Sequence, residues 1–170
     1  MRQILLLAFV LIFSASVFGQ WGKNRKVAGY KKQDYEITCA GVGVEGTKLV
    51  KVYGYARNVA RATYYAKLNA IRGVIFRGAP GSTGGCQGIQ PLAKSPDLEE
   101  EEKQYFNDFF APGGPYLSYV AVSDQEKSQR DVAKIARKTY KVGMSLAISY
   151  DALRKKLESD GIIRGLDSGF

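Results

Sequence analysis

The chain has 170 residues, carries 25 Lys and Arg against 16 Asp and Glu, and contains no histidine. The absence of histidine removes the commonest general base, the commonest zinc ligand and every catalytic triad that depends on imidazole. One domain of ordinary size accounts for this length. The net charge of +9 bears on association and solubility rather than on the fold.

The first nineteen residues have the pattern of a secretory signal peptide. Arg2 precedes an apolar run over residues 4–13, and small residues follow as far as Gly19. Cleavage near Gly19 leaves 24 basic residues against 16 acidic ones, a net charge of +8, because Arg2 is lost. The apolar run is far shorter than the roughly 20 residues that cross a bilayer, and no later stretch comes closer. We therefore expect an exported protein without a mature transmembrane helix, either periplasmic, associated with the outer membrane, or secreted.

A basic and aromatic arm is expected at residues 20–34, because its charged and aromatic side chains show neither helical nor strand periodicity. One interpretation is an arm that lies on an anionic membrane, where each basic residue contributes about 1 kcal/mol. The other is a solvated, frayed terminus. The residues that would form the membrane arm are Trp21, Lys23, Arg25, Lys26, Lys31 and Lys32. Export makes anionic lipid, acidic glycan or an acidic protein a better partner for this charge than nucleic acid.

Cys39 and Cys86 are the two cysteines of the chain, and in an exported protein they form one pair. A disulfide between them would close a loop of about 48 residues and stabilise the fold by roughly 3 to 4.5 kcal/mol on the chain-entropy model. The spacing alone leaves open whether the two residues approach within bonding distance. We predict that the pair is oxidised.

Alternating side chains predict a β-hairpin at the start of the domain. Residues 35–44 and 48–55 each alternate apolar and polar positions, and residues 45–47 form the turn. A literal GxGxxG occupies residues 41–46. A dinucleotide-binding fingerprint requires a helix to begin at its third glycine, whereas here a second β-rich run follows. We therefore expect no cofactor and interpret these glycines as flat or bulged strand positions.

The longest predicted helix covers residues 57–77 and carries two apolar stripes when its residues are placed at 100° intervals. The stripe of small side chains is expected to pack on the sheet. The stripe of bulky side chains needs a different cover, either residues 105–110 or a partner protein. The small stripe contains Val59, Ala62, Thr63, Ala66, Ala70, Gly73 and Val74. The bulky stripe contains Ala60, Tyr64, Leu68, Ile71 and Ile75. The positions expected to face water are Arg61, Tyr65, Asn69 and Arg72.

A Gly- and Pro-rich loop spans residues 78–96, and a second helix is expected from residue 97 to residue 110. The loop lacks the Gly-Lys-Ser/Thr ending of a phosphate-binding loop, so we interpret it as a connection. The acidic residues 99–102 lie where the helix dipole favours anions. They fan around the helix and lack the alternating oxygen ligands of a calcium loop, so we expect neither a metal site nor a catalytic pair there.

Two further strands and a closing helix are predicted for the last third of the chain. Residues 116–122 and 139–149 are typical of strands, whereas residues 124–137 fit either a short helix or an arm of a hairpin. Ser149 is placed to cap a helix over residues 151–159. This helix is expected to bury Ala152, Leu153 and Leu157 and to stop at Gly161, before a loosely held tail over residues 164–170.

These elements predict a single α+β domain over residues 35–163. Their order is strand, strand, helix, loop and helix, followed by strand, strand and helix. This order predicts a four-stranded antiparallel sheet with the helices packed on one face.

The strand that runs through Gly54 into a helix spaced by Ala62, Ala66 and Ala70 resembles the N-terminal domain of flagellar assembly protein T and related small surface lipoproteins of bacteria. Residues 140–163 are similar to the strand and helix that end those domains, and the two blocks together cover about a third of the mature chain. The resemblance implies a non-enzymatic envelope module that assembles with other exported proteins. It carries over no functional residue. The chain departs from that family because it lacks the lipid-accepting cysteine and adds the Gly-rich loop and the acidic helix.

The leading hypothesis is an exported structural or adaptor subunit whose partners are other envelope proteins or further copies of itself. The expected interaction surface consists of Tyr64, Leu68, Ile71 and Ile75 with Arg61 and Arg72. The alternative is a binding module for anionic lipid or acidic glycan, which would use the basic arm and the same two arginines. A carboxylate-based hydrolase is a third hypothesis, for which the sequence offers only the long loop and no paired groups. We predict no enzyme activity, no catalytic residue and no metal.

Overall fold

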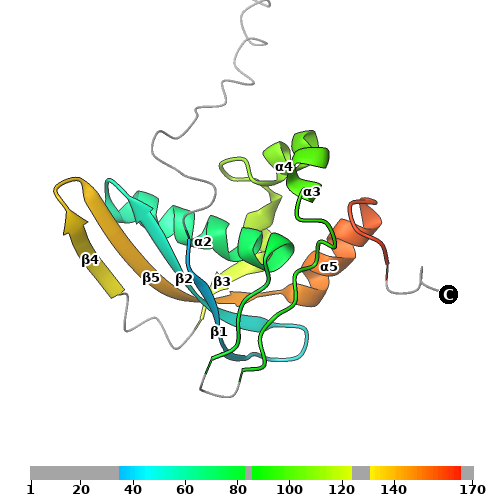
Figure 1. Cartoon of the computed structure of the whole chain (residues 1–170), viewed down its shortest axis with the longest axis horizontal. Coiled ribbons are helices and arrows are strands. Elements are labelled where there is room, and N and C mark those ends of the chain that lie inside the picture. The colour runs from blue at the N-terminus through cyan, green and yellow to red at the C-terminus, as the bar shows by residue number, and fades with distance from the viewer. Residues whose placement is uncertain (1–34, 83–85, 124–130, 166–170) are drawn as a thin grey trace, which may run out of the picture.

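The computed structural model describes residues 35–82, 86–123 and 131–165 (Figure 1). The predicted signal peptide, the predicted basic arm and the end of the tail lie outside the described residues. The described chain forms an α+β fold with one antiparallel sheet, as predicted. The sheet has five strands instead of the predicted four, because a strand forms in the segment that the sequence left open between helix and hairpin.

The sheet has the order β1, β2 and β5, and the far edge of β5 pairs with both β3 and β4. β3 pairs with the end of β5, from Leu146 to Ile148, and β4 pairs with its start, from Thr139 to Gly143. β3 and β4 therefore lie on the same side of β5, each beside a different part of it. The bounds of the strands are β1 Ile37–Val42, β2 Lys48–Ala56, β3 Val120–Val122, β4 Asp131–Ala136 and β5 Thr139–Ile148.

The predicted hairpin of β1 and β2 is present, and the interpretation of the motif's glycines as strand positions holds for Gly41 alone, because Gly43 and Gly46 lie between the two strands. The two strands are antiparallel, with Ile37 opposite Val52 and a bulge between Cys39 and Gly41. Gly46 has a φ of +74° in the turn that joins them, a conformation that glycine adopts without strain. A strand follows this turn, so the motif presents no helix N-terminus to a pyrophosphate.

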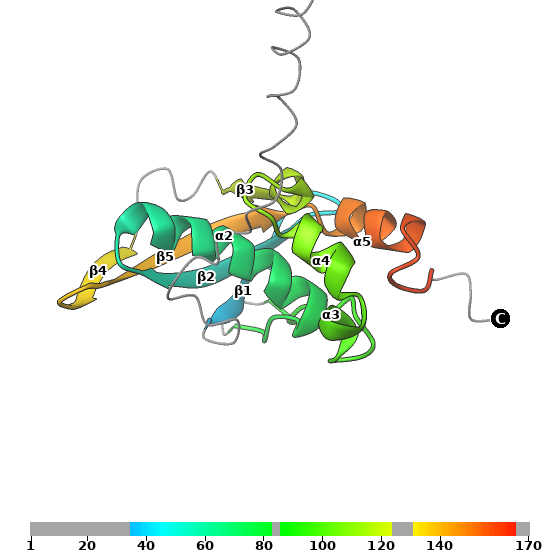
Figure 2. The ribbon, with the colours of Figure 1, turned by 90° about the horizontal axis from the view of Figure 1, so that it is seen from above.

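The helix α2, Val59–Phe76, lies across one face of the sheet over β2 and β5 (Figures 1 and 2). Asn58 caps it, since its side-chain oxygen accepts a hydrogen bond of 2.8 Å from the backbone N–H of Arg61. Gly54 permits the close approach, because a Cβ at this position would overlap the carbonyl oxygen of Ala62 and lie 2.6 Å from the amide nitrogen of Ala66. The prediction that small residues of this helix pack on the sheet is confirmed at Ala62 and Ala66, both fully buried.

Two residues of α2 that were expected to face water are buried. Tyr65 is 3% exposed and Asn69 is 1% exposed. The Asn69 side-chain amide donates a hydrogen bond of 3.3 Å to the carbonyl oxygen of Tyr53 in β2. The sheet-facing side of the helix therefore includes these positions next to Ala62 and Ala66. A helical wheel does not reveal this roll of the helix, because polar residues with partners on the sheet look like solvent-facing ones.

The bulky stripe of α2 is covered by the chain itself. Leu68, Ile71 and Ile75 are buried in the same core cluster as the aromatic residues that follow the long loop. Phe76 of α2 packs edge-on against Phe106, with ring centroids 4.9 Å apart. Of the two predicted covers, the internal one is therefore present. Ala60, the first member of the predicted stripe, is exposed.

The covering segment folds as two short helices instead of the single predicted helix. They are α3, Leu98–Glu101, and α4, Lys103–Phe109, and the backbone departs from helical geometry at Glu102 between them. A 3₁₀ helix, η2 (Pro115–Tyr119), follows where a strand was predicted, and only β3 remains of that strand. Pro115 favours the first position of this helix because it lacks an N–H. Tyr116 is fully buried with its ring 5.9 Å from that of Phe110.

The closing helix α5, Tyr150–Ser159, buries Leu153 and Leu157 completely, as predicted. Two expectations about it are wrong: Ala152 is exposed, and the side chain of Ser149 makes no capping hydrogen bond. Gly161 has a φ of +75° and ends the helical segment. Of the helices in the described ranges, none is sufficiently long and apolar to cross a membrane.

Candidate functional site

The predicted interaction surface on α2 is not present as a surface. Leu68, Ile71 and Ile75 are inside the core, and the half-buried Tyr64 packs edge-on against Tyr116, with centroids 6.5 Å apart. The side chains of Leu68, Ile71 and Ile75 would contact a partner only if the core unfolded locally. This part of the predicted site is therefore wrong, because the segment after the long loop folds back over the helix.

The two arginines of the predicted site have different roles. Arg72 forms an ion pair and a hydrogen bond with Glu99 of α3, and its guanidinium lies 4.8 Å from the centre of the Phe110 ring. Through these contacts Arg72 attaches the segment from Glu99 to Phe110 to α2. Arg61 is exposed near the start of the same helix and is available to a ligand.

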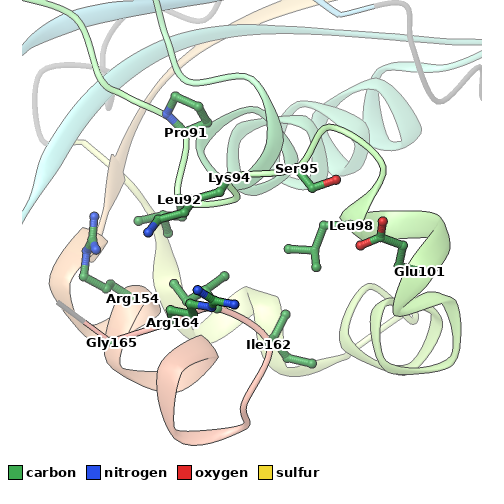
Figure 3. Close-up of a pocket in the computed structure, with 11 residues that line it drawn as sticks. Pro91, Leu92, Lys94, Ser95, Leu98, Glu101, Arg154, Ile162, Arg164 and Gly165 are labelled. Carbon is green, nitrogen blue, oxygen red and sulfur yellow. The ribbon is translucent and has the colours of Figure 1, made fainter. Parts of the chain in front are cut away.

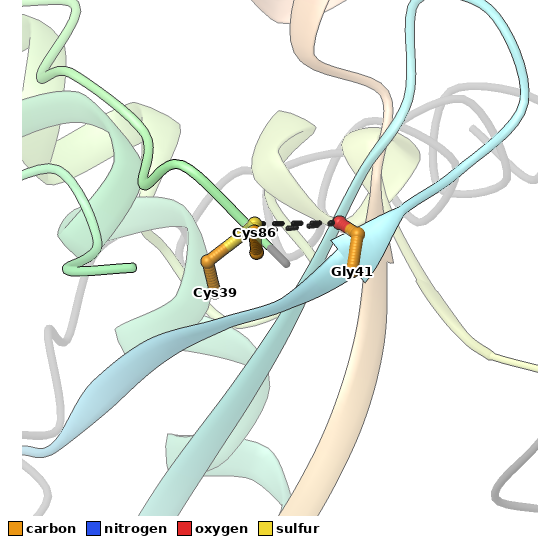
Figure 4. The surroundings of a disulfide bond; sticks show 3 residues. All are labelled: Cys39, Gly41 and Cys86. Carbon is orange, nitrogen blue, oxygen red and sulfur yellow. Dashed lines mark hydrogen bonds between the residues drawn. A yellow bond between two sulfur atoms is a disulfide. The ribbon is translucent and has the colours of Figure 1, made fainter. Parts of the chain in front are cut away.

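The disulfide between Cys39 and Cys86 is present, as predicted, with Cα atoms 5.9 Å apart (Figure 4). It ties the Gly-rich loop to β1. A disulfide is typical of proteins that fold in an oxidising compartment, and it supports export.

A backbone hydrogen bond at Cys39 adds to this attachment, and further backbone bonds hold the loop itself and join it to α2. The N–H of Cys39 donates to the carbonyl oxygen of Pro80 at 2.9 Å, and Ala79 and Ile89 exchange two bonds of 2.8 Å within the loop. Farther on, the N–H of Ala93 donates to the carbonyl oxygen of Ile75 at 2.8 Å. The first of these bonds joins the loop to β1 and the last joins it to α2, so the loop is attached to the β1 edge at Cys39.

The opposite border of the sheet is open along β4. All six residues of this strand are exposed, including Val132 at 47% and Ile135 at 53%. β4 pairs with β5 on one side, and no other strand in the described ranges pairs with it (Figure 1). We call this border, with Val132 and Ile135, the open edge. The sequence did not reveal it, because residues 124–137 show no clear period.

A small basic pocket lies at the end of the hairpin formed by β4 and β5. Its volume is about 290 Å³, and it is lined by residues from the end of β2, the start of α2 and the hairpin turn. Arg57, Arg61 and Lys138 supply three positive charges, with Tyr55 and Tyr65 beside them and no acidic residue in the lining. None of the three cations forms an ion pair with a residue that the structure describes. Only Arg61 was singled out from the sequence, since the other two join it through tertiary structure.

Burial and contacts with neighbouring side chains shift the pKa values of several groups. The hydrogen bond and charge of Lys51 lower the pKa of Asp131, and a hydrogen bond with Tyr55 raises the pKa of Lys141. Burial, followed by the hydrogen bond to Asp160, raises the pKa of Tyr105. These groups do not line the basic pocket. In the described parts of the chain there is also no group of three potential metal ligands.

Comparison of the chain with models of known protein families, with curated proteins and with solved structures finds no match. The resemblance to the flagellar protein therefore stays a prediction.

Proposed function

We propose that this protein is an exported, non-enzymatic adaptor subunit that binds an extended, acidic segment of another envelope protein along its open edge. The observation that carries the proposal is the exposure of Val132 and Ile135 on a strand that, among the strands of the described chain, pairs with β5 alone. The interaction therefore uses β4 instead of the α2 surface expected from the sequence.

The free side of β4 offers a binding mode that depends on the backbone. An edge strand presents unpaired N–H and C=O groups that a second extended chain can complete, while pockets or exposed side chains give specificity. Edge strands of monomeric proteins are usually protected against such pairing by a covering loop, a charge or a proline. Here the loop is attached to β1 at Cys39, whereas β4 has no such loop in the described chain and carries exposed Val132 and Ile135 beside the charged Asp131 and Lys134.

The charge around the hairpin favours an acidic partner. Lys134, Arg137 and Lys138 lie on β4 and its turn, and Arg57 and Arg61 join the last of these in the basic pocket. A carboxylate in the partner segment would form charge-assisted hydrogen bonds with this group. The same charges repel a second copy of the hairpin, so the partner that fits best is a different protein.

Site-specific photo-crosslinking in the envelope of the native host tests this proposal. A photoreactive residue at position 132 or 135 is expected to give one major adduct, and the crosslinked peptide is expected to be acidic. The matched control is position 44, because Val44 is 80% exposed at the turn of the other hairpin. Adducts formed only between copies of this protein, or formed equally well from position 44, would overturn the proposal.

A second measurement uses the purified complex with the partner found in this way. The double substitution Val132→Lys and Ile135→Lys should weaken binding by about ten-fold or more, because it removes apolar contact and adds charge. Val44→Lys should leave the affinity within about two-fold of the unsubstituted protein, since distant sites act independently. Equal losses in both variants would contradict an interaction at β4.

A further inference from the structure

A second and larger cleft lies on the other side of the molecule from the hairpin turn, where the end of the long loop meets α3, α5 and the segment after α5 (Figure 3). Its volume is about 700 Å³, within the range of pockets that bind small molecules. Leu92, Leu98 and Ile162 form apolar walls. The cleft belongs neither to the open edge nor to the basic pocket.

Three positive charges from separate parts of the chain line this cleft. They are Lys94 of the loop, Arg154 of α5 and Arg164 of the segment that follows. Arg154 is positioned by Glu158, with 3.7 Å between the charged groups, and by a hydrogen bond of 3.3 Å to the hydroxyl oxygen of Tyr150. Lys94 and Arg164 form no ion pair with any residue in the described ranges.

The distribution of charge gives the cleft two ends. Figure 3 shows Lys94, Arg154 and Arg164 together at one side, and Glu101 at the other side beyond Leu98. Glu101 is the acidic residue among those that line the cleft. An anionic group at the cationic end would therefore be attracted, and an apolar chain that continues toward Leu98 would cover the apolar walls.

We propose that this cleft binds a single-chain anionic amphiphile, with its anionic head at Lys94 and Arg164 and its apolar chain against Leu92, Leu98 and Ile162. A guanidinium binds a phosphate or carboxylate through two parallel hydrogen bonds, which suits Arg164 to this head. Arg154, whose terminal nitrogens face Glu158 and Tyr150, adds positive charge beside it. A free inorganic anion would leave the apolar walls exposed to water, and a neutral amphiphile would leave the positive charges without a counter-ion. A ligand with both parts satisfies both halves of the cleft.

Isothermal titration calorimetry below the critical micelle concentration tests the proposal with three probes. Dodecyl phosphate is expected to bind one to one. Dodecyl maltoside has the same chain with a neutral head, and inorganic phosphate has the charge without the chain. Each of these two is expected to bind at least about ten-fold more weakly, since each lacks one half of the interaction. Equal binding of either control, or no binding of dodecyl phosphate, would overturn the proposal.

Substitutions of exposed residues then locate the site. Lys94→Ser and Arg164→Ser should each weaken binding of dodecyl phosphate by about ten-fold, because each removes a charged hydrogen-bond donor. Both side chains are exposed, so the fold should persist, which circular dichroism verifies. Lys155→Ser is the matched control, since it removes an equal charge from an exposed position of α5 that does not line the cleft, and it should change the affinity by less than about two-fold. An equal loss in all three variants would show attraction by net charge alone and would contradict a site in this cleft.

Discussion

The two borders of the sheet are built in opposite ways. At β1, the disulfide from Cys39 to Cys86 and the hydrogen bond from Cys39 to Pro80 attach a loop to the strand at one residue. At β4, every side chain is exposed, and the strand has a partner on one side only within the described chain. The difference shows that the chain protects one edge against pairing and leaves the other accessible. On the proposed function, binding belongs to the β4 border of the sheet and the disulfide to the β1 border.

The two faces of the sheet also differ in burial. The face toward α2 carries Val50 and Val52 of β2, which are fully buried. On the other face, Tyr53 lies against Gly143, and Lys141 lies 4.0 Å from the centre of the Tyr53 ring. These outer contacts are made by partly exposed side chains and are weak individually. Substitutions on the face toward α2 should therefore lower the free energy of unfolding more than substitutions on the outer face.

The largest expected effect is the loss of the disulfide on the closed side. The double substitution Cys39→Ala and Cys86→Ala should lower the free energy of unfolding by roughly 4 kcal/mol, because the unfolded chain is no longer constrained by a loop of about 48 residues. Urea denaturation measures this change. Hydrogen exchange should show faster exchange at β1 and the loop, while β4 changes little. Reduction of the unsubstituted protein is the control, and an unchanged midpoint after reduction would contradict a stabilising role for the bond.

A smaller loss is expected where α2 meets the sheet. Gly54→Ala should destabilise the protein by about 3 kcal/mol, because the added Cβ meets the backbone of Ala62 and Ala66, which cannot rotate away. Gly143→Ala is the matched control on the opposite face. Its Cβ would lie 2.7 Å from the ring of Tyr53, a side chain that can move, so the loss should be smaller. Thermal or urea unfolding that gives equal losses for both would contradict the proposed difference between the two faces.

The smallest effect is expected at the ion pair between Lys51 of β2 and Asp131 of β4. Lys51 donates a hydrogen bond of 2.8 Å to Asp131, and this bond and the lysine charge lower the pKa of that carboxyl group. Lys51→Met should therefore return the pKa of Asp131 toward its ordinary value. An NMR titration of the carboxyl carbon measures the shift.

The sign of the linkage follows from this lowered pKa. The ion pair contributes stability above the pKa of Asp131 in the unfolded chain, and this contribution is lost as the pH falls through the lower pKa of the folded state. Because both groups are at the surface, the unfolding midpoint near neutral pH should hardly change. A carboxyl pKa that is unaffected by Lys51→Met would show that the ion pair does not form in solution.

Local patterns in the sequence determined much of this protein. Alternation predicted the hairpin of β1 and β2 and the long strand β5, because the side chains of a half-buried strand alternate between water and core. The stripe of small side chains predicted that α2 packs on the sheet. The two cysteines of an exported chain predicted the disulfide. The first two signals depend on residues that lie near one another in the sequence. The third depends on there being two cysteines, which allow one pairing.

Tertiary structure decided the features on which the functional proposals depend. β4 forms because β5 offers it a partner, although its own sequence shows no clear period. Tyr65 and Asn69 are buried because the helix is rolled on the sheet, and Leu68 is covered because the chain folds back over it. Arg57, Arg61 and Lys138 meet only after the hairpin has formed. Contacts between distant segments leave no periodic signal in a sequence, so the open edge, the basic pocket and the cleft became visible only in the folded chain.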